Sequence, residues 1–481
     1  MIRRRYLGGS AAVLGGLLAA ACGEPTVRYV GQPQAGPAGP AGPAGAKGET
    51  GAQGARGAQG AAGAAGKIPT TVSFWSGIGA NHPSGAARLD TLKLFNETMS
   101  EELNIIVDLS NSEAAAQGEG RVSEDKVKTM VAGGTPPDFY VLAYWSSAEF
   151  YVPGLTIDFD TELKTEKRYI VQKEDLFPHI RETATTAGKL QGMPSSTNNA
   201  SIIYNKGRLQ QAGVPFPPWD GSGQGQYTWD DFKVDMTKMQ QQAGIMWAFS
   251  FRWTRWLWFL GTTGARPITD DGHKVTLDTP ESVETLEYLK SIVDAGLSPP
   301  DGAGELYRQA KNDIAYEHQG PFRIPTLRQA NAPDFGVLHT PVHPVKREVF
   351  AQNGGWNSVV FKDIPLERRH AAAQVALWLS EPDAQVNHMI LATTIPVSKK
   401  GLDHPKLQEY LKTDEHLKGF VDLAPYGWRL PGIPSSRTIN SVGRDCSPIM
   451  KGEMGLQAWL TETQRELQVV VDKDQELIAK L

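Results

Sequence analysis

Glycine occupies every third position from residue 36 to residue 66 without exception, in a chain of 481 residues. Only glycine fits at the crowded axis of a collagen triple helix, so this period is typical of collagen and predicts a trimer. Because only three prolines stand in these ten triplets, the alternative is a Gly/Ala spacer in random coil. The extended form would reach about 90 Å and the flexible form about 30 Å. Both interpretations make residues 36–66 a tether with no hydrophobic core.

The residues before this segment predict export from the cytoplasm. Three arginines precede an apolar stretch that is too short to span a bilayer, and small residues then lead to a cysteine. We therefore expect residues 1–21 to be a signal peptide. Arg3, Arg4, Tyr6 and Leu7 resemble the twin-arginine pattern, and general secretion is the alternative route.

Residues 18–22, Leu-Ala-Ala-Ala-Cys, resemble a bacterial lipobox, in which the cysteine is acylated. Acyl chains on Cys22 would hold the protein on the extracytoplasmic face of the membrane, because each buried CH₂ contributes about 0.8 kcal/mol. We expect this lipidation, with residues 22–35 as a linker. The alternative is cleavage after Ala21, which leaves Cys22 as a free thiol. With Cys22 acylated, Cys446 is the one remaining cysteine and cannot form an intrachain disulfide.

The rest of the chain has the composition of a globular protein. Hydrophobic residues make up 40% and charged residues 21%, and the formal net charge is -5. A chain of this length predicts two lobes rather than one domain. The negative charge and the absence of basic clusters interleaved with aromatic residues argue against nucleic-acid binding.

From residue 70 onward, strand-like and helix-like patterns alternate. Residues 70–77 and 104–110 are short apolar runs typical of strands, and residues 86–103 between them have apolar residues at helical spacing. A second helical pattern at 124–132 ends at Gly133-Gly134 and Pro136-Pro137, and an apolar strand follows from Phe139. This alternation predicts an α/β fold.

An ordered series of motifs then resembles one family. The helix and Gly133-Gly134-Thr135-Pro136-Pro137-Asp138 turn come first, followed by matching stretches at 188–218, 228–232, 275–296, 354–361, 371–385 and 393–401. Together they are similar to extracellular solute-binding proteins of bacterial ABC importers, the carbohydrate-binding type (family 1). The resemblance covers about residues 68–481. It implies a periplasmic-binding-protein type II architecture: two α/β lobes, a hinge and an interlobe cleft that closes on a ligand.

The same resemblance implies the domain boundaries and the partners. Three chain crossings, near Asn198, Gly354 and Pro425, would place residues 68–199 and 357–425 in one lobe and 200–350 and 430–481 in the other. The expected partners are a carbohydrate ligand and the permease subunits of an ABC transporter, with no cofactor and no metal. His339 and His343 are separated by Pro341, which excludes helical metal ligation by that pair.

A sugar site is expected to be rich in tryptophan, because aromatic rings stack on the C–H face of a sugar while amides, carboxylates and arginine pair with its hydroxyls. Trp258 ranks below the other candidate ligand contacts. We expect Trp229, Trp247 and Trp378 to be core residues. The candidate ligand contacts are Trp75, Asn81, Trp145, Asn198, Trp253, Trp256, Trp356, Tyr426 and Arg437.

Two other function classes stay open at this point. A surface-displayed polysaccharide-degrading enzyme would place a carboxylate pair across an aromatic cleft, although no catalytic residues stand out in the sequence. An adhesive protein built on a collagen trimer would explain residues 36–66 but would leave the lobes without a role. We expect a binding protein and not an enzyme.

Overall fold

The computed structural model describes residues 68–111, 123–166, 168–219, 221, 225–302, 314–332, 334–441, 443 and 445–481. The chain divides into two units, Met1–Ala65 and Gly66–Leu481, and the description below concerns the second. The predicted signal peptide, the lipidation site Cys22, the linker and the Gly-x-y segment lie outside the described residues.

The first sheet has the strand order β12-β11-β3-β1-β2. Strand β6 also pairs with β11, along the edge opposite to β3. Strand β1 is parallel to β2 and β3, while β11 is antiparallel to β3 and β6. Its strands are β1 (Thr70–Ser76), β2 (Ile105–Asp108), β3 (Phe139–Ala143), β6 (Met193–Asn199), β11 (Ala351–Val360) and β12 (Gly427–Trp428). The predicted α/β class is confirmed.

Helix α1 (Pro83–Thr98) illustrates how this sheet is covered. His82 caps its N-terminus by accepting a hydrogen bond from the Ser84 N–H, and Pro83 supplies a preset φ at the first helical position. The buried side chains of Leu92 and Phe95 then face the sheet. Asn96 fixes the helix to β2, since its amide both donates to and accepts from the backbone of Val107. Helices α4 (Glu124–Ala132) and α13 (Leu366–Trp378) also belong to this part of the fold.

The second sheet has the strand order β10-β7-β9-β8. These strands are β7 (Ser201–Asn205), β8 (Phe249–Ser250), β9 (Tyr316–Gln319) and β10 (Phe335–Leu338). Helices α8 (Lys206–Gln211), α9 (Trp229–Ala243), α10 (Leu257–Gly261), α11 (Pro280–Asp294) and α20 (Leu456–Ile478) accompany it. Helix α9 begins with a capping box between Thr228 and Asp231 and ends at Gly244, whose φ of 63° closes the helix.

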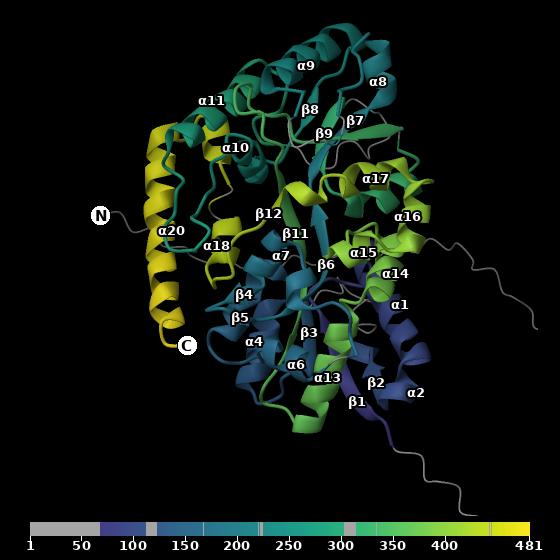
Figure 1. The fold of residues 1–481 in the computed structure, drawn as a ribbon. Coiled ribbons are helices and arrows are strands. Elements are labelled where there is room, and N and C mark those ends of the chain that lie inside the picture. The colour runs from purple at the N-terminus through teal and green to yellow at the C-terminus, as the bar shows by residue number, and fades with distance from the viewer. Residues whose placement is uncertain are drawn as a thin grey trace, which may run out of the picture. The chain divides into compact units, whose positions relative to one another are not determined.

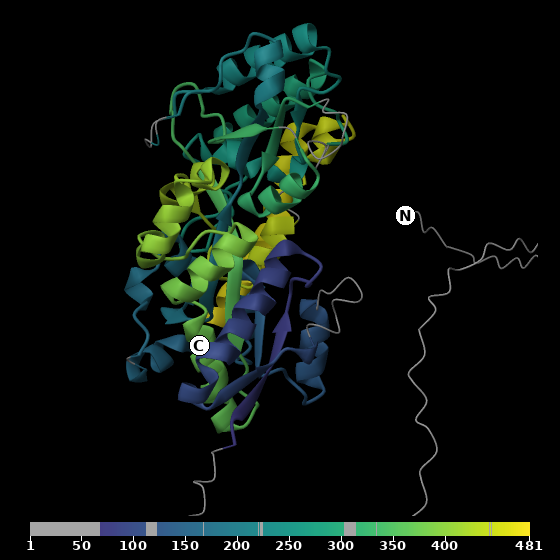
Figure 2. The ribbon, with the colours of Figure 1, turned by 90° about the vertical axis from the view of Figure 1, so that its right-hand side faces the viewer.

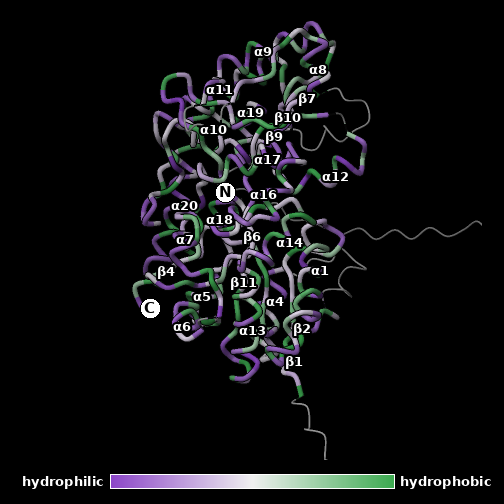
Figure 3. Tube along the Cα trace, turned by 45° about the vertical axis from the view of Figure 1, so that its right-hand side comes forward, coloured by the Kyte–Doolittle hydropathy of each residue, from purple (hydrophilic) through white to green (hydrophobic). Residues whose placement is uncertain are grey.

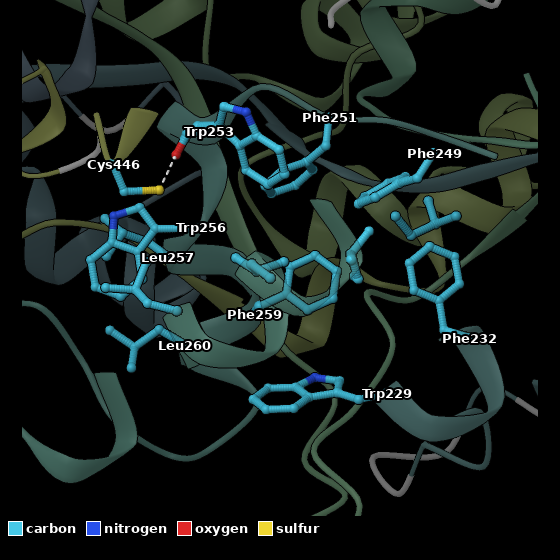
Figure 4. Close-up of a cluster of buried hydrophobic side chains, with 14 of the residues drawn as sticks. Trp229, Phe232, Phe249, Phe251, Trp253, Trp256, Leu257, Phe259, Leu260 and Cys446 are labelled. Carbon is cyan, nitrogen blue, oxygen red and sulfur yellow. Dashed lines mark hydrogen bonds between the residues drawn. The ribbon is translucent and has the colours of Figure 1, made fainter. Parts of the chain in front are cut away.

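An aromatic core packs against the second sheet (Figure 4). Cys446 belongs to it and donates a hydrogen bond from Sγ to the carbonyl of Trp253, with a separation of 3.2 Å. Burial raises the pKa of this thiol well above its usual value. The rings labelled in the figure are Trp229, Phe232, Phe249, Phe251, Trp253, Trp256 and Phe259.

The chain crosses from the first sheet to the second between β6 and β7. Strand β6 ends at Asn199 and β7 begins at Ser201, so a single residue, Ala200, separates a strand of one sheet from a strand of the other. Strands β6 and β11 lie between the part built on β1 and the part built on β9 (Figure 1). The view turned by 90° shows the same separation between the purple N-terminal elements and the teal helices (Figure 2).

The segments after β11 divide between the two parts. Helix α13 packs in the core of the first sheet, whereas α16 and α17 share a hydrophobic cluster with β7 and β10. Residues from Leu430 to Val471 contribute to the aromatic core. The remaining helices and strands are α2 (Ser100–Leu103), α5 (Ala148–Tyr151), α6 (Phe159–Thr165), α7 (Pro178–Thr183), β4 (Thr185–Thr186), β5 (Lys189–Leu190), α12 (Ile324–Gln329), α14 (Pro382–Ala392), α15 (Lys399–Leu402), α16 (Pro405–Leu411), α17 (Glu415–Val421), α18 (Ser436–Ser441) and α19 (Ser447–Met450).

Hydrophobic and hydrophilic residues alternate along the helices (Figure 3). Within the described residues, no helix combines the length and the apolar character needed to cross a membrane.

Candidate binding site

A pocket of about 160 Å³ lies where the chain crosses between the sheets. Strands β6 and β11 supply one part of its wall, and the turns and helices that follow β3, β8 and β9, together with α18, supply most of the rest. The described lining residues are Tyr144, Trp145, Asn198, Ala200, Arg255, Trp258, Phe322, Gln352, Asn353, Gly354 and Asn440. Elements of both sheets therefore build one site.

Aromatic rings form much of this wall. Tyr144 and Trp145 stand on the 3₁₀ turn Tyr144–Ser146 directly after β3, with their rings edge to face at a centroid distance of 5.0 Å. Trp258 comes from α10 and contacts the His318 ring, also edge to face. Phe322 comes from the short turn after β9. Rings of this kind offer flat apolar faces to a ligand.

Amide side chains provide the polar part of the pocket. Gln352 and Asn353 are consecutive residues near the start of β11 and are only 3% and 1% exposed. Their side-chain oxygens have no hydrogen-bond partner among the described residues, although the Asn353 amide lies 3.0 Å from His179 Nε2. An unpaired buried acceptor costs about 1–3 kcal/mol. These two oxygens are therefore suited to accept hydrogen bonds from hydroxyl or N–H groups of a ligand.

A buried arginine stands behind the pocket wall. Arg429 Nη2 donates to Thr197 Oγ1 at 2.8 Å and to the carbonyl of Gly354 at 2.6 Å. Its guanidinium lies 4.6 Å from the centroid of the Tyr144 ring, a cation–π distance. Burial lowers the pKa of Arg429 to about 10, so it stays charged at neutral pH. Burial first and the charge of Arg429 second lower the pKa of His179 to about 3, which keeps that imidazole neutral.

The structure brings two of the predicted contact residues, Trp145 and Asn198, to this pocket. Trp258, which we ranked below the other candidates, also lines it. Trp253 and Trp256 do not, because they are 2% and 0% exposed and belong to the aromatic core. Their indole N–H groups donate to the carbonyls of Pro300 and Gly443 instead.

The other predicted tryptophans also lie away from the pocket lining. Trp75 on β1 packs against a small cluster around Tyr140, with the Lys126 ammonium 5.5 Å from its ring. Trp356 packs partly buried against the core of the first sheet. Of the tryptophans expected in cores, Trp229 and Trp378 are 3% and 8% exposed, and Trp247 is half-buried.

Three predicted polar contacts have other surroundings. Asn81 is exposed in the loop before α1. Tyr426 donates its hydroxyl to the carbonyl of Gly221 at 2.7 Å. Arg437, on α18, lies 3.6 Å from the Glu149 carboxylate and 3.7 Å from that of Asp125, so it joins α18 to α5 and α4.

Sequence reasoning missed several lining residues. Gln352 and Asn353 immediately precede the Gly354-Gly355-Trp356-Asn357 motif, so their position beside a crossing strand was a usable signal. Tyr144 directly precedes Trp145 in the same turn. Arg255, Phe322 and Asn440 come from short turns and helices that carry no motif.

One group of described side chains has metal-ligating atoms close together, Asp334, Glu415 and His416. Lys206 already forms ion pairs with both carboxylates, at 3.1 and 2.8 Å. None of these residues lines the pocket between the sheets. Their arrangement is that of a surface ion-pair network joining α8 to α17.

Residues 115–417 match the model of the family described as bacterial extracellular solute-binding protein. The chain belongs to this family. Members of this family are binding proteins that act outside the cytoplasm. A binding protein of Brucella abortus (strain 2308) is 22% identical over 332 residues, which cover 66% of this chain and 75% of that relative.

Solved structures of solute-binding proteins share the fold. An ABC substrate-binding protein from Listeria monocytogenes in complex with cycloalternan aligns with a TM-score of 0.68 at 19% identity, over 84% of this chain and 99% of that one. The sugar-binding protein MalE from Xanthomonas citri aligns at 0.69 and 18%, over 86% and 100%. UgpB from Mycobacterium tuberculosis, in complex with glycerophosphocholine, aligns at 0.67 and 18%, over 84% and 98%. The two-lobed architecture is confirmed.

Proposed function

We propose that this solute-binding protein captures a carbohydrate in the pocket between its two sheets and delivers it to the permease of an ABC importer. The observation that carries this proposal is the composition of the pocket wall. Tyr144, Trp145 and Trp258 offer aromatic faces, and Gln352 and Asn353 offer buried oxygens that accept no hydrogen bond from the part of the chain that the structure describes. A sugar presents an apolar face and a rim of hydroxyl donors, which matches both.

The size of the pocket favours a small ligand. Its volume of about 160 Å³ is below the roughly 300–1,000 Å³ of sites that enclose drug-sized molecules. We therefore expect one or two sugar rings to be enclosed. The Listeria protein forms a complex with cycloalternan and the Xanthomonas protein is a sugar-binding protein, which supports the same class of solute here.

A thermal-shift screen against mono- and disaccharides, followed by calorimetric titration of the hits, tests this proposal. A ligand at about 100 times its Kd stabilises the folded protein by about 2.7 kcal/mol, so a binding sugar should raise the melting temperature clearly. The bound sugar should be recovered unchanged with no new reducing ends. Failure of every carbohydrate in the screen would contradict the proposal, and release of reducing ends would contradict the assignment as a binding protein.

We also propose that acylated Cys22 anchors the protein and that residues 36–66 are its tether. Two or three acyl chains hold a soluble protein on a bilayer, since a single chain binds only marginally. The test is fractionation of cells that express the full chain. Wild type should be found with membranes and Cys22→Ser should be released, and equal release of both would contradict the anchor. Sedimentation analysis of the soluble form decides whether the tether makes a trimer.

The lobe boundaries stay a prediction. We propose that residues 68–199 and 351–392 form one lobe around β1 and that 200–350 and 430–481 form the other. Helices α16 and α17 share their hydrophobic cluster with β7 and β10, so we place residues 405–424 with the second lobe. Lobe closure about β6 and β11 would then reshape the pocket around the ligand.

A further inference from the structure

The charge of the pocket wall is positive within the described residues. Among its described lining residues, Arg255 is the one charged side chain, and no carboxylate is present. A neutral sugar site commonly uses carboxylates to accept from hydroxyls, whereas this wall offers amide oxygens for that purpose. Arg255 is half-buried and its guanidinium is positioned by a hydrogen bond from Nη1 to the carbonyl of His318.

Arg429 adds a second positive charge immediately behind the wall. Its contacts are Thr197, Gly354 and the Tyr144 ring, of which Gly354 and Tyr144 line the pocket. Arg429 is 2% exposed, and its Nε and Nη1 have no hydrogen-bond partner among the described residues. A buried charge without a counter-charge is costly, and its field extends far in a medium of low dielectric constant. Among the described residues, no carboxylate pairs with Arg429.

Two other buried charged residues lie outside the pocket lining. Glu317 on β9 is a buried carboxylate, but Gln319 donates a hydrogen bond to it and it does not line the pocket. Arg88 is buried like Arg429 and donates to Ser195 and Ser196 on β6. Neither of those serines lines the pocket, so Arg88 is a matched internal control for the effect of a buried arginine on folding.

We propose that the solute carries an anionic group, a carboxylate or a phosphate, which binds at Arg255 in the field of Arg429. This inference rests on the proposed carbohydrate function and narrows it to sugar acids or sugar phosphates. Arg255 provides the direct charge-assisted hydrogen bonds, since a guanidinium matches the two oxygens of a carboxylate or phosphate. Arg429 acts through the wall by electrostatic attraction and by holding Tyr144 and Gly354 in position.

Calorimetric titration with matched ligands tests the proposal. The probes are glucose, glucuronate and glucose 6-phosphate, and galactose with galacturonate, together with glycerol 3-phosphate and acetate as anions that are not carbohydrates. We expect at least one sugar acid or sugar phosphate to bind at least tenfold more tightly than its neutral parent. That preference should decrease as the salt concentration is raised from 20 to 500 mM in these titrations. Added ions screen the attraction between the arginines and the anion, since the Debye length is already only roughly 10 Å at 0.1 M.

Each outcome has a distinct meaning. Equal or tighter binding of the neutral sugars would overturn the anionic inference and leave the carbohydrate function standing. Binding of only glycerol 3-phosphate or acetate would support the anionic site and overturn the carbohydrate function. Binding of none of these probes would count against both.

Variants assign the effect to residues. Arg255→Gln should reduce the preference for the anionic ligand at least tenfold and change the affinity for a neutral sugar less than threefold, while Arg255→Lys should keep part of the preference. Arg429→Gln should also reduce the preference. Arg88→Gln should lower the melting temperature without changing the ratio of the two affinities. If Arg255→Gln and Arg88→Gln give the same ratio as wild type, the proposal is wrong.

Discussion

Two tryptophans, Trp145 and Trp256, occupy opposite environments in this protein. Trp145 is half-buried and lines the pocket, and its ring centroid lies 5.0 Å from that of Tyr144. Trp256 is fully buried, packs edge to face on Trp459 and donates its N–H to the carbonyl of Gly443. The exposed part of Trp145 can therefore contact either solvent or a ligand, whereas Trp256 is enclosed within the core.

Alanine at these two positions should separate binding from stability. Trp145→Ala should weaken the binding of the best ligand at least tenfold, about 1.4 kcal/mol, with a loss of unfolding free energy of about 1–2 kcal/mol. Trp256→Ala should cost about 3–5 kcal/mol of stability because it leaves a large cavity in the core. Calorimetry and denaturant titration measure the two quantities. Unchanged affinity in a folded Trp145→Ala protein would remove this residue from the site.

At the scale of the element, strand β11 contains a glycine whose position leaves no room for a side chain. Gly355 has φ of +146°, and a Cβ at this position would lie 2.2 Å from Arg429 Nη2 and 2.5 Å from the Ser196 carbonyl. The Ser196 oxygen belongs to the backbone of β6, the strand paired with β11, and so cannot move aside locally. The close contact of β6, β11 and Arg429 therefore requires the absence of a side chain.

Gly355→Ala should destabilise the protein by about 2 kcal/mol or more, because it combines backbone strain with a steric clash. Gly455→Ala is the matched control, since a Cβ there meets nothing within 4 Å and Gly455 has φ of -69°. The control should change stability by less than about 1 kcal/mol. Thermal unfolding of both variants checks this, and equal melting temperatures would show that β6 and β11 tolerate a wider spacing.

Helix α17 has a pH-dependent cap. The carboxylate of Asp414 accepts from the Leu417 N–H at 3.0 Å and from Arg328 at 2.7 Å. Burial opposes its ionisation, but the hydrogen bonds from Arg328 and Leu417 outweigh burial and lower the pKa of Asp414. A lowered pKa in the folded state means that this contribution to stability is present above the unfolded pKa of about 3.9 and is lost as the pH falls through the folded value.

Asp414→Asn should therefore cost about 1–2 kcal/mol at pH 7, and the difference from wild type should shrink as the pH falls below about 4. Denaturant titration at pH 7 and at a series of acidic pH values measures it. Asp403→Asn, which removes an exposed partner of Lys399, should change stability by less than about 0.5 kcal/mol. A difference between Asp414→Asn and wild type that grows toward acidic pH would contradict the assignment.

At the scale of the whole molecule, the described lining residues of the pocket begin at Tyr144, far along the chain from the Gly-x-y segment. Deletion of residues 36–66 from a soluble form should leave ligand affinity within twofold of the full-length value. Calorimetry on the two proteins with the same ligand measures this. A tenfold loss would show that the segment takes part in binding, and the tether proposal would be withdrawn.

The α/β class followed from local signals, because turn motifs and helix caps act through neighbouring residues, whereas the two-lobed architecture was predicted from the chain length and the family resemblance. The helix predicted at residues 124–132 ends at Gly133 in the structure as well, where Gly133 caps α4. Contact with ligand is different in kind, since it depends on which face of a turn is covered by another part of the chain. Trp256 and Trp258 stand two residues apart, and only packing against Trp459 and the pocket distinguishes them.

Local sequence patterns were enough to predict the alternation of strands and helices between residues 70 and 143, the resemblance to the family and the difference of residues 36–66 from the globular part. Hydrophobic period, capping residues and glycine spacing are properties of short stretches, so they can be interpreted without knowledge of the fold. That Arg255, Gln352 and Asn353 share a pocket with Trp145, and that Arg429 lies behind it, depends on how the chain packs in three dimensions. Those residues come from distant segments that meet where the chain crosses between two sheets, and no local pattern records such a meeting.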